Sequence, residues 1–300
     1  MSIDTSLLAG LPSLKLRAEA VVQGILSGIH KSSCQGQSVE FAEHKEYSPG
    51  DDLRHLDWKA FGKFDRYYVK RFEQETEQRA ILAVDASGSM AYASGPMSKL
   101  EIASTLAAAV AWILIRQQDA VGLMVFGDGD VHFIPPGTGP SHLRQLLESL
   151  DSLSGKGRTS LSQMASCLAG RAKNRESIFV FSDFFDDAPD AAHPLLALHA
   201  CRHELSLFHV LDTDELSFPF DTPSLFLPME GPGESLAAHP RDLRDSYLKL
   251  MESFTEGLRR QALESGSSYV RVTNADSLDL VLRAFADQRN RSVRTSGRRT

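Results

Sequence analysis

A short run of oxygen-bearing side chains follows an apolar segment in the first third of the chain. Residues 80–84 (AILAV) are entirely apolar, and Asp85, Ser87 and Ser89 come directly after them in the pattern D-x-S-x-S. If residues 80–84 form a strand, the loop after it brings one carboxylate and two hydroxyls around a common point. Oxygen ligands of these two kinds suit a hard cation such as Mg²⁺. The loop therefore predicts a cation site at the end of this strand.

Two further loops carry side chains of the same kind. Residues 157–160 (GRTS) open a predicted helix, so Thr159 offers a hydroxyl near a helix N-terminus, although Ser160 could instead act as a plain N-cap. Asp183 directly follows the apolar run 177–182 (SIFVFS). Ligands of open α/β sheets bind outside the carboxyl ends of the strands. The candidate metal ligands are therefore Asp85, Ser87, Ser89, Thr159 and Asp183.

The elements that must position these loops alternate along the chain. Apolar and alternating runs predict strands at residues 80–84, 120–126, 131–134, 177–182, 204–211 and 268–272. Helical spacing predicts helices at residues 98–118, 141–151, 160–172, 190–200, 240–264 and 276–289, the first with a capping box of Ser98 and Glu101. This alternation predicts an α/β fold with a doubly wound, mostly parallel sheet. We expect strand 131–134 to be antiparallel at one edge and the other strands to be parallel and central.

The first 78 residues differ in character from the rest. Residues 12–28 show apolar side chains at helical spacing, while the following fifty residues mix both charge signs with aromatic residues. The segments SVEFAEHKEY (38–47) and DRYYVKRFEQE (65–75) predict short strands. We predict three regions: an N-terminal helix and mixed-strand subdomain (1–78), the α/β domain (79–288) and a basic flexible tail (289–300).

The three strand-end loops resemble the metal-ion-dependent adhesion site (MIDAS) of the von Willebrand factor A (vWA) domain superfamily. The resemblance implies a Rossmann-like vWA fold in which Ser87 and Ser89 bind the metal directly. It further implies that Asp85 and Asp183 bind the metal directly or through water, and that Thr159 does so in one state of the site. The implied cofactor is Mg²⁺ or another divalent cation such as Mn²⁺ or Ca²⁺. An Asp or Glu of a protein partner would complete the metal shell through a charge-assisted contact.

The segment before the α/β domain resembles a bacterial family named domain of unknown function 58. The similarity lies in residues 36–41, in YSPGDDLRHLDW (47–58) and in VKRFE (69–73), and with the metal loops it covers about residues 28–285. Such proteins are typically encoded beside MoxR-type AAA+ ATPases. The resemblance thus implies an adaptor or co-chaperone that serves such an ATPase in protein assembly or maturation. We expect Trp58 to be buried and the twelve-residue motif to have a structural role.

Composition limits the classes of function. The 300 residues include 32 Lys or Arg and 39 Asp or Glu, and the net charge of −7 argues against bulk nucleic-acid binding. No stretch approaches the ~18 consecutive apolar residues of a membrane span, and no signal segment is recognisable. The three cysteines, Cys34, Cys167 and Cys201, suggest no disulfide framework. We expect a cytoplasmic protein of the short soluble type, without membrane insertion.

Two alternatives to a binding module stay open. A metal-assisted hydrolase would use the same cation to activate water, and it needs a general base for which Asp186 and Asp187 are the nearest candidates in sequence. A metal-free scaffold would only hydrogen-bond the loop residues to one another. An aspartyl-nucleophile phosphohydrolase is disfavoured, because Ser87 stands where its second acid would be. We expect a non-enzymatic, divalent-metal-dependent protein-binding module.

Overall fold

The computed structural model of the chain describes residues 3–32, 44–46, 68–70, 78–127, 130–158, 160–173, 175–186, 188, 190–230, 233 and 235–296. The chain divides into two compact units, one of residues 1–27 with 78–300 and one of residues 28–77. In the second unit the structure describes the antiparallel pair β1 (His44–Glu46) and β2 (Tyr68–Lys70). Each strand lies within a segment for which the sequence predicts a strand. The YSPGDDLRHLDW motif and Trp58 lie outside the described residues.

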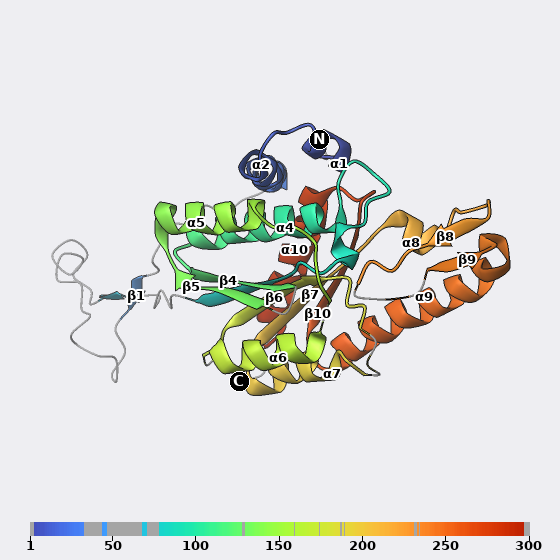
Figure 1. The fold of residues 1–300 in the computed structure, drawn as a ribbon. Coiled ribbons are helices and arrows are strands. Elements are labelled where there is room, and N and C mark those ends of the chain that lie inside the picture. Colours follow the sequence, from blue (N-terminus) through green and yellow to red (C-terminus); the bar gives the residue numbers. More distant parts are fainter. Residues whose placement is uncertain are drawn as a thin grey trace. The chain divides into compact units, whose positions relative to one another are not determined.

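A six-stranded sheet forms the centre of the first unit (Figure 1). Its strands are β3 (Arg79–Asp85), β4 (Ala120–Gly127), β5 (Asp130–Gly137), β6 (Ser177–Ser182), β7 (Glu204–Leu211) and β10 (Ser268–Thr273). Their order is β10-β7-β6-β3-β4-β5, and every neighbouring pair is parallel except β4 with β5. The predicted doubly wound, mostly parallel α/β sheet is confirmed, and β5 is the predicted antiparallel edge strand. The winding reverses between β3 and β6, where such sheets bind ligands.

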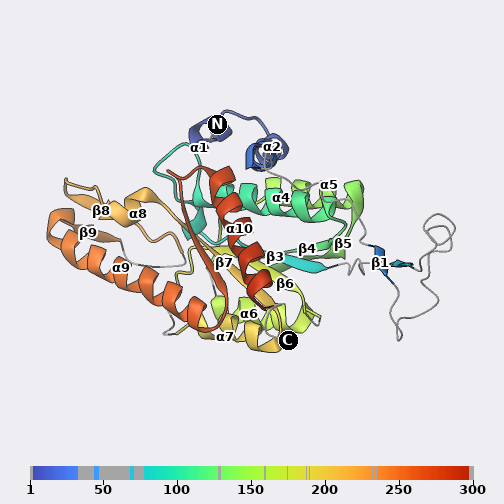
Figure 2. The ribbon, with the colours of Figure 1, turned by 180° about the vertical axis from the view of Figure 1, so that it is seen from behind.

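Helices cover both faces of this sheet (Figures 1 and 2). One face carries α4 (Lys99–Arg116), α5 (Gly139–Asp151) and α10 (Leu278–Ser296). The other face carries α6 (Leu161–Arg171), α7 (His193–Leu196) with the 3-10 helix η3 (Ala197–Cys201), and α9 (Pro240–Glu264). Because both faces are covered, the interiors of β3 (residues 80–84) and β6 (residues 178–181) are apolar, as is usual for parallel strands. Among the helices that the structure describes, none has the length and apolar character that crossing a membrane demands.

The capping box predicted at the start of α4 is present. The Ser98 backbone N–H donates to Glu101 Oε2 at 2.8 Å, and the Glu101 N–H donates to Ser98 Oγ at 3.2 Å. These two bonds satisfy backbone donors that have no partner inside the helix. The cap therefore fixes where α4 begins, and with it the position of the next residue, Lys99.

The two N-terminal helices pack with the α/β unit, which differs from the predicted boundary after residue 78. These helices are α1 (Thr5–Ala9) and α2 (Leu14–Ser32), and α2 buries Leu14, Ala18, Val21, Val22 and Ile25 in the core cluster that contains α4. Fourteen of the 18 residues of α4 are buried, more than the one side that the sheet can cover. The apolar face of α2 contributes to covering the rest. The N-terminal helix is thus part of the core.

Two further elements differ from the sequence expectation. Strand β10 is parallel as predicted but lies at the sheet edge rather than in the centre, since it pairs only with β7. Its residues 268–271 are only partly buried or exposed, which an interior strand would not tolerate. Helix α10 runs to Ser296, so the predicted basic tail begins inside a helix.

His209 on β7 is a buried histidine in aromatic surroundings. Its ring centroid lies 5.5 Å from that of Phe184 and 5.6 Å from that of Phe254, and its Nδ1 lies 2.7 Å from Tyr269 Oη. Burial lowers the pKa of His209 to about 3, and the positive charges of Lys99 and Arg271 act in the same direction. Between about pH 3 and pH 6.5, the folded protein therefore keeps the His209 imidazole neutral, whereas the unfolded chain binds a proton there.

The packing of α2 predicts a sharp difference between its two faces. Val21→Asp places a carboxylate at a fully buried position and should lower the free energy of unfolding by about 3 kcal/mol or more. Leu16→Asp on the same helix is the matched control, because Leu16 is 41% exposed, and should cost no more than about 1 kcal/mol. Urea unfolding measures both. Equal losses would mean that α2 does not belong to the core.

The neutral state of His209 predicts loss of stability in acid. Its pKa is depressed in the folded state, so the unfolded chain takes up a proton first as pH falls below about 6.5. Between pH 7 and pH 5 this should remove up to about 2 kcal/mol of unfolding free energy, a loss that His209→Phe should not show. Urea unfolding of both proteins at the two pH values gives the difference. Parallel pH dependence in the two proteins would contradict the assignment.

Candidate metal-binding site

Four of the five predicted metal ligands lie at the carboxyl ends of two neighbouring strands. Asp85 is the last residue of β3, and Asp183 directly follows β6. Ser87 lies in the loop between β3 and the short 3-10 helix η2 (Ser89–Ala91), and Ser89 is the first residue of η2. Asp85, Ser87 and Asp183 are fully buried, whereas Ser89 is half-buried. The fifth candidate, Thr159, lies outside the described residues.

Asp85 joins the two strand ends through both of its oxygens. Its Oδ1 accepts the Ser87 backbone N–H at 2.9 Å, and its Oδ2 accepts the Ser182 hydroxyl at 2.6 Å. Burial raises the pKa of Asp85 to about 6, and repulsion from the Asp183 carboxylate adds to the rise. Two buried carboxylates thus lie close enough to repel each other. Positive charge at this place would lower the free energy of the charged pair.

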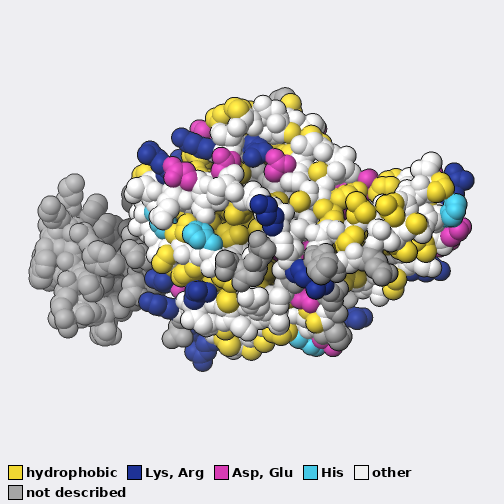
Figure 3. Space-filling model, in the orientation of Figure 1, with side chains coloured by type: hydrophobic (Ala, Val, Ile, Leu, Met, Phe, Trp, Pro, Cys, Tyr) yellow, Lys and Arg dark blue, Asp and Glu magenta, His cyan; other side chains and the backbone are white. Residues whose placement is uncertain are grey.

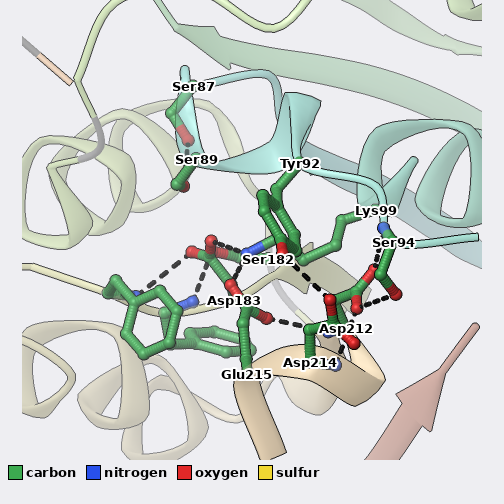
Figure 4. Close-up of polar contacts among 12 residues, drawn as sticks. Ser87, Ser89, Tyr92, Ser94, Lys99, Ser182, Asp183, Asp212, Asp214 and Glu215 are labelled. Carbon is green, nitrogen blue, oxygen red and sulfur yellow. Dashed lines mark hydrogen bonds and ion pairs between the residues drawn. The ribbon is translucent and has the colours of Figure 1, made fainter. Parts of the chain in front are cut away.

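The two serine hydroxyls have the spacing of adjacent metal ligands. Ser87 Oγ and Ser89 Oγ share a hydrogen bond at 3.1 Å, and the two side chains lie next to each other in Figure 4. In octahedral coordination at 2.0–2.1 Å, neighbouring ligands of Mg²⁺ lie about 3 Å apart. The separation therefore fits two ligands of one small cation.

A lysine that the sequence analysis did not single out supplies positive charge to this site. Lys99 is the first residue of α4 and is fully buried. Its Nζ lies 2.8 Å from Asp183 Oδ2 and 2.5 Å from Glu215 Oε1 (Figure 4). Burial alone would lower the pKa of Lys99, but the two carboxylates raise it, so the ammonium stays charged. The sequence held one signal of this ion pair. A positive charge in the first turn of a helix is unfavourable because of the helix dipole, so a lysine there indicates an acidic partner.

Helix α8 (Thr213–Ser217), which carries Glu215, is held against the end of β7. Glu215 Oε2 accepts the Asp212 backbone N–H at 2.8 Å, while its Oε1 contacts Lys99. Burial raises the pKa of Glu215 in spite of its ion pair with Lys99. Glu215 therefore caps the N-terminus of α8 and binds the buried ammonium of Lys99 at the same time.

A second polar cluster continues from β7 to β10. The buried Asp212 accepts the Ser94 backbone N–H at 2.9 Å and the Asn274 side-chain amide at 3.0 Å. Nearby, the Tyr92 hydroxyl donates to Asp214 Oδ2 at 3.3 Å (Figure 4), and burial and the acids around it raise the pKa of Tyr92 to about 12. The neighbouring strands β3, β6, β7 and β10 thus each end in or next to a polar residue. These residues lie along one edge of the sheet.

The chemistry of the donor set fits a hard divalent cation. Within the described part of the chain, no group of three or more His, Cys, Asp or Glu is arranged to hold a metal. The set at β3 and β6 is of another kind, because it combines the carboxylate of Asp85 with the hydroxyls of Ser87 and Ser89. Oxygen donors with few carboxylates suit Mg²⁺, which also keeps several water ligands. Asp183 contributes negative charge beside this set while paired with Lys99.

The candidate general base Asp186 has a structural place in the loop after β6. Its Oδ2 accepts the backbone N–H of Leu161, the first residue of α6, at 2.9 Å, and its Oδ1 accepts the Ala188 N–H at 2.9 Å. One oxygen therefore orders the start of α6, and the other orders the loop that carries Asp186. Asp187 lies outside the described residues.

Relatives in mycobacteria are similar to most of this chain. The uncharacterized protein Rv1480 of Mycobacterium tuberculosis and the uncharacterized protein Mb1516 of Mycobacterium bovis are each 26% identical to it over 219 residues. The match covers 72% of this chain and 68% of each relative.

Three solved structures resemble the chain at low sequence identity. The conserved hypothetical protein BatB of Bacteroides thetaiotaomicron is 20% identical with a TM-score of 0.47, over 70% of this chain and 98% of that one. An aerotolerance-related membrane protein of Bacteroides fragilis is 18% identical with a TM-score of 0.45, over 71% and 99% of the two chains. The VWA domain of SpRpn10 is 12% identical with a TM-score of 0.40, over 68% and 93%.

One protein family matches most of the sequence. The match runs over residues 43–253, which is more than half of the chain and includes β3, β6 and the loops that follow them. The chain therefore belongs to the family described as protein of unknown function DUF58.

Proposed function

We propose that this protein is a non-enzymatic, divalent-metal-dependent protein-binding module. The observation that carries the proposal is the meeting of Asp85, Ser87 and Ser89 with Asp183 at the ends of two adjacent parallel strands. In this arrangement Ser87 and Ser89 would hold Mg²⁺, or another divalent cation such as Mn²⁺ or Ca²⁺, and Asp85 would balance its charge. The MIDAS resemblance of the loops supports the same assignment.

The residues around the site favour binding over chemistry on a substrate. Asp85 and Asp183 are fully buried and held by hydrogen bonds or an ion pair, so they position charge rather than transfer protons to a ligand. Two neutral hydroxyls and the single carboxylate of Asp85 leave part of a divalent cation's charge uncompensated, because Asp183 is already paired with Lys99. An Asp or Glu from another protein would be attracted to that charge and oriented by it. The half-buried Ser89 marks the side from which such an acid reaches the site.

We further propose a MoxR-type AAA+ ATPase as the partner, with the module acting as its adaptor or co-chaperone in protein assembly or maturation. Support comes from membership in the DUF58 family together with the neighbourhood that the family resemblance implies. The partner would supply the Asp or Glu that completes the metal shell.

A metal-free scaffold is a second candidate function, and one observation favours it. The Lys99 ammonium already provides a positive charge to Asp183 and Glu215 inside the fold. In a scaffold, Lys99 would be the only cation of the site, and the loops would serve to hold α4, α8 and the sheet together. The two candidates differ in whether a divalent cation binds at all.

Asp85→Ala should abolish Mg²⁺ binding measured by calorimetry, because it removes the carboxylate that balances the cation. Ser87→Ala should weaken binding less, since it removes a neutral ligand. Asp245→Ala is the matched control on the exposed surface of α9 and should bind Mg²⁺ like the wild type. None of the three substituted side chains is apolar, so no variant removes a hydrophobic core contact, and all should fold.

The same proteins test the partner. The wild type should retain a MoxR-type ATPase from the same genome in a pull-down with Mg²⁺ and lose it in EDTA, and Asp85→Ala should behave like the EDTA sample. Retention that is indifferent to EDTA would show that no cation bridges the two proteins.

Lys99→Met separates the two candidate functions. Removing the ammonium leaves Asp183 and Glu215 buried without a counter-charge, which should lower the unfolding free energy by about 3–5 kcal/mol. In a metal-binding module, saturating Mg²⁺ should restore part of this loss, because a ligand that binds only the folded state stabilises it. In a scaffold, Mg²⁺ should change nothing. Lys249→Met on the exposed surface of α9 is the control, and urea unfolding with Mg²⁺ or EDTA is the measurement.

A further inference from the structure

A β-hairpin between β7 and α9 is anchored by aromatic contacts. Its antiparallel strands are β8 (Ser224–Phe226) and β9 (Leu236–Ala238). The ring centroid of Phe226 lies 5.9 Å from that of Phe218, and the ring of Phe218 lies 4.5 Å from that of Tyr247 on α9. The hairpin is therefore held to the rest of the fold by the side chain of Phe226 and its aromatic neighbours.

The side chains that alternate with Phe226 are apolar and face solvent. Leu225, Leu227 and Met229 are 60%, 67% and 47% exposed. Leu225 pairs across the hairpin with Ala237, which is also exposed, so these two side chains lie on the same side of the strands. Figure 3 shows hydrophobic side chains gathered on the surface over α8 and β8. We call Leu225, Leu227, Met229 and Ala237 the hairpin face.

The hairpin face adjoins the loop that carries the candidate metal ligands. A Cβ placed on Gly88 would lie only 2.0 Å from the carbonyl oxygen of Met229, so the two backbones are in direct contact. At the next residue, Glu230 Oε1 accepts the backbone N–H of Ser89 at 3.3 Å. Ser89 is the half-buried candidate ligand, on the side from which an acid reaches the site. A protein that places an acid there therefore also meets the hairpin face.

A carboxylate on a cation covers too little surface to hold two proteins together specifically. Specific interfaces bury about 800 Å² on each partner and have an apolar centre, in which a few side chains carry most of the binding energy. A partner of the proposed cation site must therefore cover surface beside the metal loop. Leu225 and Leu227 offer exposed apolar side chains there, and the hairpin is anchored through Phe226 instead.

Charge distinguishes the possible occupants of the hairpin face. Residues 224–229 and 236–238 include no charged side chain, so the group that covers them must be apolar. Residues 221–250 as a whole hold five Asp or Glu and three Lys or Arg, and the chain has a net charge of −7. An anionic lipid surface attracts basic segments and would repel this excess of acid. A second copy would bring the same excess to the interface, whereas a different protein need not.

We infer that the hairpin face is the apolar part of the partner-binding surface, and that its occupant is a protein segment with apolar side chains next to the Asp or Glu that completes the metal shell. The inference rests on the proposed function, because that acid needs a cation at Ser87 and Ser89. The cation orients the partner, and burial of Leu225 and Leu227 contributes affinity. An acidic segment without apolar neighbours binds the same site only weakly.

The double substitution of Leu225→Gln with Leu227→Gln tests the inference in the full chain. Both side chains are exposed and neither is a metal ligand, so the variant should fold and bind Mg²⁺ in calorimetry like the wild type. Its affinity for the MoxR-type ATPase of the same genome, measured in Mg²⁺, should fall at least about tenfold, because two apolar side chains no longer contribute to the interface.

The matched control is a double substitution of two exposed leucines on other parts of the surface. Leu16→Gln on α2 and Leu263→Gln in the last turn of α9 make the same chemical change at side chains that are 41% and 47% exposed. This variant should bind the ATPase like the wild type. An equal loss of affinity in the two double variants would mean that the hairpin face has no special role, and would overturn the inference.

The outcomes separate the inference from the function on which it rests. Mg²⁺-dependent binding that the hairpin variant retains overturns the role of the hairpin face and leaves the proposed function standing. Binding that survives EDTA but is lost in the hairpin variant overturns the metal bridge and supports the hairpin face as a docking surface. If the wild type binds no ATPase in either condition, the proposed partner fails, and the hairpin face fails with it.

Two further measurements address the other possible occupants. The wild type should not sediment with vesicles of phosphatidylglycerol and phosphatidylethanolamine, and it should have the same oligomeric state as the hairpin variant in analytical ultracentrifugation. Binding to vesicles that the hairpin variant loses would assign the face to a lipid surface. A dimer that the hairpin variant loses would assign it to a second copy. Either result would overturn the inference.

Discussion

Two buried carboxylates at neighbouring strand ends need positive charge, and much of the site follows from that need. Asp85 and Asp183 lie where β3 and β6 end, in a place with little access to water. Burial raises the pKa of Asp85, and repulsion from Asp183 adds to the rise. Lys99 supplies part of this positive charge, because its ammonium is held between Asp183 and Glu215. This ion pair ties the start of α4 to the end of β6 and to α8. Lys99 contacts only the Asp183 side of the site. On the other side, Ser87 Oγ and Ser89 Oγ lie 3.1 Å apart, a separation that fits two ligands of one small cation.

The parallel sheet makes this concentration of charge unavoidable. Parallel strands end at one edge, so polar residues that follow β3, β6, β7 and β10 come together even though they are far apart in sequence. The hydrogen bonds of Asp212 to Ser94 and Asn274 bind the loops of this edge to one another. Because the loops are braced in this way, the few groups that face outward can be positioned accurately. Glu230 adds one more acid at this edge, where its carboxylate accepts the Ser89 backbone N–H.

Much of the fold could be predicted because its signals are local. The apolar run at residues 80–84 and the mixed pattern of α9 each identify an element from its own residues, and the capping box of Ser98 and Glu101 marks a helix start within four positions. The candidate site was accessible for a related reason. A D-x-S-x-S loop that directly follows a buried strand must lie at the sheet edge, and so must an Asp after a second such strand.

By itself, then, the sequence determined the strands of the main sheet, most helices, the parallel winding and the placement of Asp85, Ser87, Ser89 and Asp183 at one edge of the sheet. Only the tertiary structure decided that α2 covers α4, that β10 lies at the edge, and that Lys99, Glu215 and Glu230 join the site. The physical reason is the range of the interactions. Periodicity, caps and strand-end loops act between residues a few positions apart. The ion pairs of Lys99 span 84 and 116 positions, and no local pattern announces a charge whose partner is brought to it by the folding of the whole sheet.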